Sequence, residues 1–231
     1  MMLEVLRDAD LVARRAAEII VTEAQAAVAA RGRFVMAVSG GRTPWAMLRK
    51  LAALDMPWPE VHMLQVDERV APANHPDRNL THLTASLASF DGSVAGRVEP
   101  MPVEMTDLEE AVLEYGRTVA NAAGSPAVLD LVHLGLGADG HTASLVPGDP
   151  VLNVVHADVA VTGLYQGRQR MTLTYPVINR ARRILWVITG ADKAEMLARL
   201  RRSDSTIPAG RVRQLHAVVL ADDAAAGRER P

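Results

Sequence analysis

An aspartate and a histidine that follow an apolar segment are the residues of this sequence best suited to acid–base chemistry. The apolar run 129–134 leads into a segment with three glycines, and Asp139 and His141 lie within that segment. Buried parallel strands read as continuous apolar runs, and ligands of such sheets bind just beyond the carboxyl ends of the strands. Because an imidazole titrates near pH ~6.5, we predict that His141 is a general base whose ring Asp139 orients. The alternative is a loop histidine that only caps or hydrogen-bonds its own loop.

The three glycines of this segment, Gly135, Gly137 and Gly140, also match the dinucleotide fingerprint G-x-G-x-x-G. That fingerprint belongs in the first βαβ unit of a domain, where it opens a long helix. Here the glycines lie past the middle of the chain, and Pro147 follows soon after Gly140. A long helix is therefore not expected, and the position of the pattern argues against a dinucleotide site.

A second glycine turn, which follows the apolar run 34–38, predicts a phosphate-binding loop. The turn consists of Ser39, Gly40, Gly41, Arg42 and Thr43. Glycine lets backbone N–H groups approach an anion, and the N-terminus of the next helix attracts negative charge. We expect Thr43 to cap that helix, with Pro44 in its first position. The alternative is an ordinary strand-to-helix turn that needs glycines for its geometry.

Charged residues beside other apolar segments supply further candidates. The triplet Asp-Glu-Arg at 67–69 directly follows the run 61–66, although such a triplet is often only solvated. Arg170 begins the segment 170–174, and Lys193 lies at the start of a helix after Gly190, although it is equally typical of a surface residue. His133 lies inside an apolar run and is expected to be a core residue. The seven histidines show no spacing typical of metal ligands.

The elements that must position these residues alternate between strand and helix along the chain. Strands are expected at 34–38, 61–66, 98–101, 129–134, 154–161, 170–174, 184–189 and 215–220. Helices are expected at 8–31, 44–54, 80–88, 108–122 and 191–200, and Gly32 is expected to end the first of them. Strands that alternate with helices of this length indicate βαβ units. The predicted fold class is therefore α/β, Rossmann-like, with a mostly parallel sheet flanked by helices on both faces.

Length and composition fit a single domain that spans residues 1–231. The chain has 231 residues, no cysteine and a formal net charge of -2, with the two signs interspersed. This charge gives no electrostatic reason to expect nucleic acid or an anionic membrane as a partner. The apolar stretches fall short of the ~18 residues of a membrane span, and the first residues lack the apolar core of a signal peptide. We therefore expect a cytoplasmic protein, which agrees with the absence of cysteine.

Five segments, taken in order, resemble the 6-phosphogluconolactonase family, within the wider group that includes glucosamine-6-phosphate deaminase. They are 38–44, 67–69 with Asn79, 134–144, 170–174 and 190–194. The third of them resembles the signature G-x-G-x-D-G-H-x-A-S, and the last two resemble R-x-T-L-T and G-x-x-K-A. Each segment alone is a weak signal, but five in order over nearly the whole chain are specific.

The resemblance implies that the protein hydrolyses 6-phospho-D-glucono-1,5-lactone, with no metal or organic cofactor. In this hypothesis His141 activates a water molecule and Asp139 orients the imidazole. The candidates for binding the oxyanion are Arg69 and the amides of Gly137 and Gly140. The residues expected to bind the phosphate or other parts of the substrate are Ser39, Gly40, Gly41, Arg42, Thr43, Asp67, Gly137, Gly140, Arg170 and Lys193. The expected partner is this phosphorylated sugar lactone alone, and the expected state is a monomer or a weak homo-oligomer.

Three other functions remain open at this point. Deaminase relatives carry a glutamate shortly after the D-G-H segment, used to open the sugar ring, and residues 144–147 here contain no carboxylate. The missing acid favours a lactonase over a deaminase or isomerase. The other two alternatives are a dinucleotide-dependent oxidoreductase and a non-catalytic sugar-phosphate sensor, for which no basic DNA-reading module is evident. Arg78 and Gly210 depart from the family pattern, in which serine is common at both positions.

Overall fold

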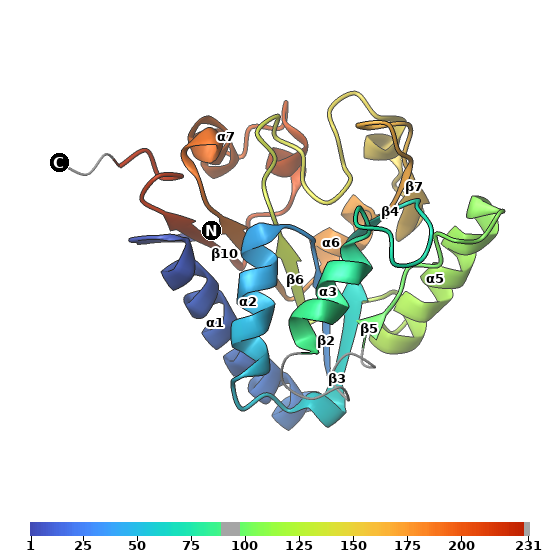
Figure 1. The fold of residues 1–231 in the computed structure, drawn as a ribbon, viewed down its shortest axis with the longest axis horizontal. Coiled ribbons are helices and arrows are strands. Elements are labelled where there is room, and N and C mark those ends of the chain that lie inside the picture. The colour runs from blue at the N-terminus through green and yellow to red at the C-terminus, as the bar shows by residue number, and fades with distance from the viewer. Residues whose placement is uncertain (89–97, 229–231) are drawn as a thin grey trace.

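The computed structural model describes residues 1–88 and 98–228, which form two sheets with helices packed around the larger one (Figure 1). The larger sheet has seven strands in the order β1-β10-β9-β6-β2-β3-β5, and every neighbouring pair is parallel. Its strands are β1 (Met2–Leu6), β2 (Phe34–Val38), β3 (Val61–Gln65), β5 (Val98–Glu99), β6 (Leu131–Leu134), β9 (Arg183–Ile188) and β10 (Ala217–Asp222). A parallel arrangement brings the carboxyl ends of all these strands to one edge, where ligands bind in folds of this kind.

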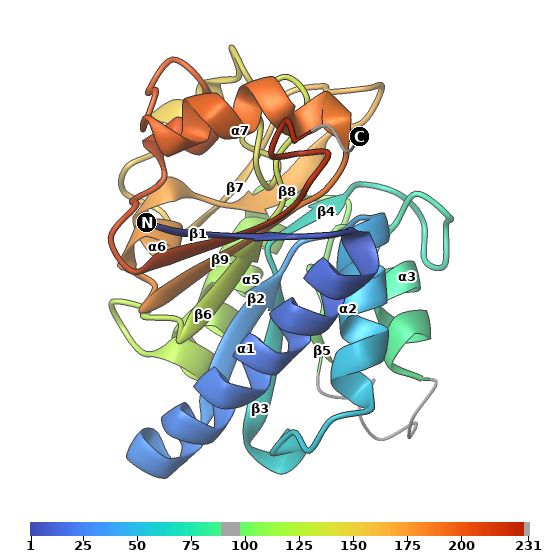
Figure 2. The same ribbon diagram turned by 90° about the vertical axis from the view of Figure 1, so that its left-hand side faces the viewer.

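Helices cover both faces of the larger sheet, and Figure 2 shows α7 on one side with α1 and α2 on the other. One face carries α1 (Ala9–Arg31), α2 (Arg42–Ala52) and α3 (Asn79–Leu87). The opposite face carries α5 (Leu108–Ala123), α6 (Tyr175–Arg180) and α7 (Ala194–Arg201). The predicted α/β fold with a parallel sheet between two helical layers is therefore confirmed.

Strand β2 shows how a continuous apolar run serves both faces of the sheet. Phe34, Met36 and Val38 pack in the hydrophobic cluster that includes α1 and α2, whereas Val35 and Ala37 pack in the cluster that includes α5 and α7. Successive side chains of a strand point to opposite faces, so this alternation follows from strand geometry. All five side chains are buried because helices cover both faces.

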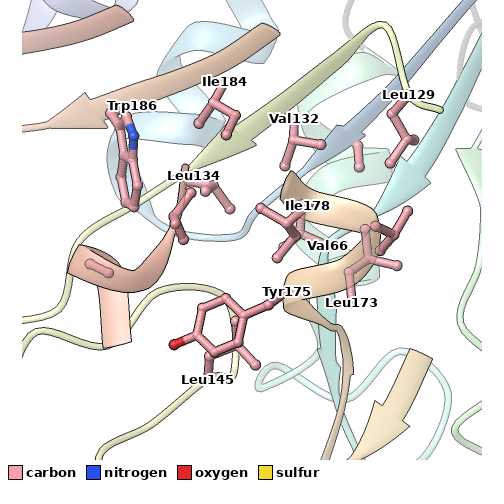
Figure 3. Close-up of a cluster of buried hydrophobic side chains, with 14 of the residues drawn as sticks. Val66, Leu129, Val132, Leu134, Leu145, Leu173, Tyr175, Ile178, Ile184 and Trp186 are labelled. Atoms are coloured by element: carbon pink, nitrogen blue, oxygen red, sulfur yellow. The ribbon is translucent and has the colours of Figure 1, made fainter. Parts of the chain in front are cut away.

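The loop that follows β6 is anchored in the second of these clusters. Its Leu145 is fully buried and belongs to the same cluster as Leu134 and Tyr175. Figure 3 shows the Leu145 side chain directed to the ring of Tyr175, beneath the sheet. Packing therefore fixes this loop only four residues after the candidate base, His141.

A second, smaller sheet begins where β3 ends. It contains three antiparallel strands in the order β4 (Asp67–Arg69), β8 (Arg170–Leu173) and β7 (Val159–Val161). Val66 joins the two sheets, because its N–H donates to the Val38 carbonyl at 2.9 Å and its carbonyl accepts from the Leu173 N–H at 2.8 Å. The small sheet therefore lies at the carboxyl edge of the large one.

Most of the expected elements are present, with ends that differ by a few residues. The first helix is confirmed: Asp8 caps its start by accepting from the Leu11 N–H at 3.0 Å, and Gly32 ends it at a φ of 73°. The strand expected at 98–101 is reduced to β5, and of the strand expected at 154–161 only β7 forms. The helix expected at 191–200 begins with a 3-10 turn, Ala191–Lys193, before α7.

Among the α-helices and strands of the described residues, β1, β4 and α6 were not predicted. By contrast, the expectation that the G-x-G-x-x-G segment opens no long helix is confirmed. Residues 135–149 form turns and an isolated bridge, and the next helical turn is the 3-10 segment Pro150–Asn153. Within the described ranges, no helix combines the length and apolar character needed to cross a membrane.

Candidate active site

A cavity of about 200 Å³ lies at the carboxyl ends of the parallel strands, between the two sheets. Its lining is rich in glycine and in charged side chains, and it brings together residues from every segment singled out in the sequence. The lining residues are Ser39, Gly40, Gly41, Asp67, Arg69, Asn79, Gly135, Leu136, Gly137, His141, Thr142, Ala143, Arg170 and Lys193. Sequence positions more than 150 residues apart therefore meet at one site.

His141 is paired with a carboxylate, as predicted from the sequence. Its Nδ1 lies 2.5 Å from Asp139 Oδ1, and its backbone N–H donates to the same oxygen at 3.1 Å. A carboxylate at Nδ1 selects the tautomer with the proton on Nδ1, which leaves Nε2 able to accept a proton from a ligand or water. Asp139 does not line the cavity itself. Its contact with the site is made through the histidine ring.

A tyrosine that the sequence analysis did not identify completes this group. The Tyr165 hydroxyl donates to the second oxygen of Asp139, Oδ2, at 3.0 Å. Partial burial tends to raise the pKa of Asp139, but the hydrogen bonds from His141 and Tyr165 hold the pKa below its ordinary value. Asp139 is therefore ionised near neutral pH, as an orienting carboxylate must be.

The two amides that we expected to bind an oxyanion are both used within the histidine loop. The Gly137 N–H donates to the His141 carbonyl at 2.8 Å, and the Gly140 N–H donates to the Gly137 carbonyl at 3.0 Å. Gly140 also lies outside the cavity lining, with its α-carbon packed against Ile207. The carbonyls of this tight glycine loop satisfy both amides, so neither amide is free for an oxyanion in this structure.

The small sheet places three charged side chains on one face. Arg69 and Arg170 lie directly opposite each other in the antiparallel pair of β4 and β8, and Asp67 lies two residues from Arg69 on the same strand. Alternate residues of a strand share a face, so all three side chains point to the same side. All three line the cavity.

Two like charges directly opposite each other in a sheet repel. Here the negative charge of the buried Asp67 carboxylate attracts both arginines and offsets their repulsion. Burial raises the pKa of Asp67, while the Ser144 hydroxyl, which donates to Oδ2 at 2.7 Å, and the two arginines oppose that rise. Arg170 is only 5% exposed, and burial lowers its pKa. This face is therefore a desolvated group of charges rather than a solvated loop.

Arg170 has bonding capacity to spare. Its Nη2 donates to Gln166 Oε1 at 3.2 Å, and its guanidinium lies 4.8 Å from the centre of the Tyr165 ring. Its Nε is buried and has no hydrogen-bond partner among the described residues. A buried guanidinium with unused donors in a cavity is suited to an anionic ligand.

The first glycine turn reaches the cavity with only part of its length. Ser39, Gly40 and Gly41 line the cavity, and the N–H groups of the two glycines have no acceptor among the described residues. Arg42 and Thr43 instead line a separate cavity of about 440 Å³ beside it. The structure therefore divides the five residues that we grouped as one phosphate loop.

The predicted cap of α2 was also wrong. The helix begins at Arg42 with Gly41 as its N-cap, so Pro44 occupies the third helical position. The Thr43 hydroxyl does not cap the helix, because it is hydrogen-bonded to the hydroxyl of Thr189 at 2.7 Å. A capping threonine and a tertiary contact compete for the same hydroxyl, and the tertiary contact prevails here.

His133 is a core residue, as expected, and it supports the glycine turn. It is fully buried in β6, and its Nδ1 accepts a hydrogen bond from the Ser39 N–H at 3.2 Å. The Ser39 hydroxyl donates to the His133 carbonyl at 3.1 Å. These two bonds fix the start of the turn on β6, the strand that leads into the histidine loop.

We expect His133 to make the folding stability dependent on pH. Burial lowers its pKa to about 3, whereas the unfolded chain takes up a proton there near pH 6.5. As pH falls from about 6.5 to 3, the unfolded state binds a proton that the folded state does not, so stability falls by about 1.4 kcal/mol per pH unit. His133→Asn keeps an acceptor for Ser39 but does not titrate, so the slope of unfolding free energy between pH 4 and 6 should be smaller.

The measurement is chemical denaturation at several pH values. The same substitution at the exposed His156 is the control and should leave the slope of the parent unchanged. An unchanged slope in His133→Asn contradicts the prediction, whatever the absolute stability of the variant.

The two positions that depart from the family pattern have structural explanations. Arg78 is 2% exposed and bridges Glu68, at 3.2 Å, and Glu104, at 2.5 Å. Its charge balances that of Glu68, which is fully buried and accepts from the backbone N–H of Asn79 at 2.7 Å. At Gly210 a side chain would overlap the carbonyl of Asp204, so this turn needs glycine.

Lys193 lines the cavity from the segment after β9, and its ammonium is paired with Asp192 at 2.9 Å. Asp192 is largely exposed, so the pair is open to solvent and exchangeable with a ligand. Among residues 1–88 and 98–228, histidine, aspartate and glutamate side chains form no group of three or more that could hold a metal ion.

Together, the parallel sheet, the cationic cavity at its carboxyl edge and the carboxylate-bound histidine define an α/β enzyme. More narrowly, the chain belongs to the family described as glucosamine-6-phosphate isomerases/6-phosphogluconolactonase, whose model matches residues 7–220. It is 36% identical to a 6-phosphogluconolactonase of Synechocystis sp. over 85% of this chain and 83% of that protein. It is 35% identical to a 6-phosphogluconolactonase of Nostoc sp. over 98% of this chain and 97% of that protein.

Solved structures agree with this assignment. The crystal structure of 6-phosphogluconolactonase from Thermotoga maritima matches with a TM-score of 0.84 and 26% identity, covering 96% of this chain and 98% of that one. A monomeric glucosamine-6-phosphate deaminase matches with a TM-score of 0.82 and 21% identity, covering 99% and 100%. The second match shows the fold alone, so the fold does not separate the two activities.

Proposed function

We propose that this protein hydrolyses 6-phospho-D-glucono-1,5-lactone to 6-phospho-D-gluconate. The observation that carries the proposal is the Asp139–His141 pair at a cavity that is also lined by the buried guanidinium group of Arg170. A general base beside a cationic pocket suits an ester whose far end is an anion. The relatives named as 6-phosphogluconolactonases, which match over most of the chain, support the same substrate.

In the proposed reaction, His141 Nε2 takes a proton from water as the water oxygen attacks the lactone carbonyl. The resulting oxyanion is stabilised by positive charge, for which Arg69 is our candidate, since it lines the same cavity as His141. Collapse of the tetrahedral intermediate breaks the bond between the carbonyl carbon and the ring oxygen. That oxygen receives the proton from the imidazolium, which restores the neutral base.

We assign the phosphate of the substrate to the glycine turn and the cations that line the cavity. The free N–H groups of Gly40 and Gly41 lie at the N-terminus of the 11-residue helix α2, where the helix dipole favours an anion. Lys193 and Arg170 add positive charge. The phosphate binds alike in the ground and transition states, so these residues act mainly on KM.

A sugar-phosphate deaminase is the second candidate, because a deaminase shares the fold. The segment after the histidine, residues 144–147, holds no carboxylate, and its Ser144 and Leu145 are fully buried. The Ser144 hydroxyl is committed to Asp67. This arrangement favours lactone hydrolysis, in which no carbon-bound proton is moved.

The deciding experiment follows acid release from freshly prepared lactone, corrected for spontaneous opening, in parallel with ammonia release from glucosamine 6-phosphate. We expect acid release well above the background and no ammonia. The His141→Ala protein supplies the matched blank. Ammonia release without lactone turnover would assign the deaminase reaction instead, and tight ligand binding without either would indicate a sensor.

We expect Gly137→Ala to reduce kcat by about tenfold to hundredfold, since small displacements of a catalytic group have effects of this size. A Cβ at Gly137 would overlap the His141 ring and lie 2.6 Å from Asp139 Oδ1. The pair must therefore separate or shift. Steady-state kinetics and thermal unfolding test this, with unfolding close to that of the parent.

The control is Gly116→Ala in helix α5, where an added Cβ meets no atom within 4 Å. It should retain the kcat of the parent. If Gly137→Ala also retains the kcat of the parent, the close approach of this glycine to Asp139 and His141 does not matter for catalysis.

A further inference from the structure

Tyr165 lies at the point where the histidine loop and the arginine of the small sheet meet. It belongs to the turn between β7 and β8, and its hydroxyl donates to Asp139 Oδ2 at 3.0 Å. Its ring packs edge-on against the His141 ring, with 5.5 Å between centres. The guanidinium of Arg170 lies over the face of the same ring. The Tyr165 side chain therefore contacts His141, Asp139 and Arg170.

The turn that carries Tyr165 is fixed at both ends. Tyr165 and Arg168 exchange backbone hydrogen bonds, of 3.0 and 3.3 Å. Arg168 is paired with Asp77 at 2.7 Å, which fastens the turn to the loop that follows β4. The turn that carries Tyr165 is thus held in place by contacts that do not involve the histidine. Such a residue can impose a position on its neighbours.

We propose that Tyr165 is a positioning residue for the reaction: its hydroxyl fixes the Asp139 carboxylate and its ring fixes Arg170. The proposal rests on the proposed function. With Oδ2 held by Tyr165, only Oδ1 faces the imidazole, so the proton stays on Nδ1 and Nε2 stays free as the base. The ring at the same time provides an aromatic face for the Arg170 guanidinium.

The charges around this group agree with a hydroxyl that donates. Partial burial and the neighbouring Asp139 raise the pKa of Tyr165, so the phenol keeps its proton at neutral pH. The charged groups that act on Tyr165 are Asp139 from the histidine loop and Arg170 from the small sheet. The other charged groups that line the cavity are Asp67 and Arg69 of the small sheet and Lys193. The one other acidic side chain among these, Asp67, is hydrogen-bonded to Ser144, and Asp139 is the carboxylate bonded to His141 Nδ1.

Two substitutions separate the two roles. Tyr165→Phe keeps the ring and removes the hydroxyl, so kcat should fall by roughly tenfold, the size expected for one hydrogen bond to a charged group, with little change in KM. Tyr165→Ala removes the ring as well, so KM should also rise, because Arg170 loses its support. Leu164→Ala, at the neighbouring and largely exposed position, is the control and should behave as the parent.

A second measurement does not depend on turnover. The nitrogen-15 NMR signals of the neutral His141 ring, identified by their loss in His141→Ala, report which nitrogen carries the proton. We expect the Nδ1–H form in the parent and in Leu164→Ala, and a mixture with the Nε2–H form in Tyr165→Phe. The proposal is overturned if Tyr165→Phe has the same His141 tautomer as the parent, or if it has the same kcat as the parent. If the parent shows no lactone turnover but the tautomer shifts as expected, the positioning role stands and the proposed function falls.

Discussion

His141→Ala is expected to lower kcat for lactone hydrolysis by about 10²–10⁴, the contribution typical of a positioned general base. The substitution removes the only imidazole among the cavity-lining residues, and with it the histidine partner of Asp139. The phosphate contacts are unaffected, so KM should change little. His141 is partly exposed, so the fold should not depend on it.

The measurement is the steady-state rate at neutral pH with the spontaneous opening of the lactone subtracted. His156→Ala, at an exposed position outside this cavity, is the matched control and should retain the rate of the parent. Turnover by His141→Ala within about threefold of the parent would exclude the histidine as the base.

Arg170→Ala is expected to raise KM by about a hundredfold, with a much smaller effect on kcat. Loss of one partner from a buried charge pair costs about 2–5 kcal/mol, which corresponds to changes of this order or larger in affinity. Arg170 is buried and lines the cavity with its positive charge, so we expect it to bind the anion of the ligand. Substrate and transition state carry the same phosphate, so both lose the contact.

The control is Arg182→Ala. Arg182 is half exposed and is paired with Asp130. It lies just before β9, at the opposite edge of the sheet from the cavity. It should leave both kinetic constants unchanged. A large loss of kcat in Arg170→Ala with KM unchanged would place this arginine at the reacting carbonyl instead of at the phosphate.

The sequence was most informative where one physical cause decides the structure. The apolar run of β2 can only be buried on both faces, and the spacing in α1, with Asp8 and Gly32 at its ends, leaves few alternatives to a helix. Asp139 and His141 could be paired from the sequence because they are two residues apart on one loop. Their contact needs no tertiary structure beyond that loop.

Elements and contacts that depend on distant partners could not be predicted. The triplet at β4 reads as a solvated loop, yet Glu68 is fully buried because four N–H donors converge on it, those of Gln65, Arg69, Asn79 and Leu80. Tyr165 is an isolated aromatic residue in a turn, and its partner Asp139 lies 26 residues earlier in the chain. Strand β1 is short, includes the charged Glu4 and owes its conformation to pairing with β10 at the other end of the chain.

The main chain of Val66 has a consequence for how the cavity is made ready for its ligand. Its N–H and its carbonyl are bonded to different sheets, so a rotation of the small sheet away from the large one would break at least one of these bonds. Asp67 and Arg69 are therefore held at a set spacing from Ser39 and Gly40 before a ligand arrives. The conformational entropy of assembling the two walls is lost once, during folding, and not again at each binding event.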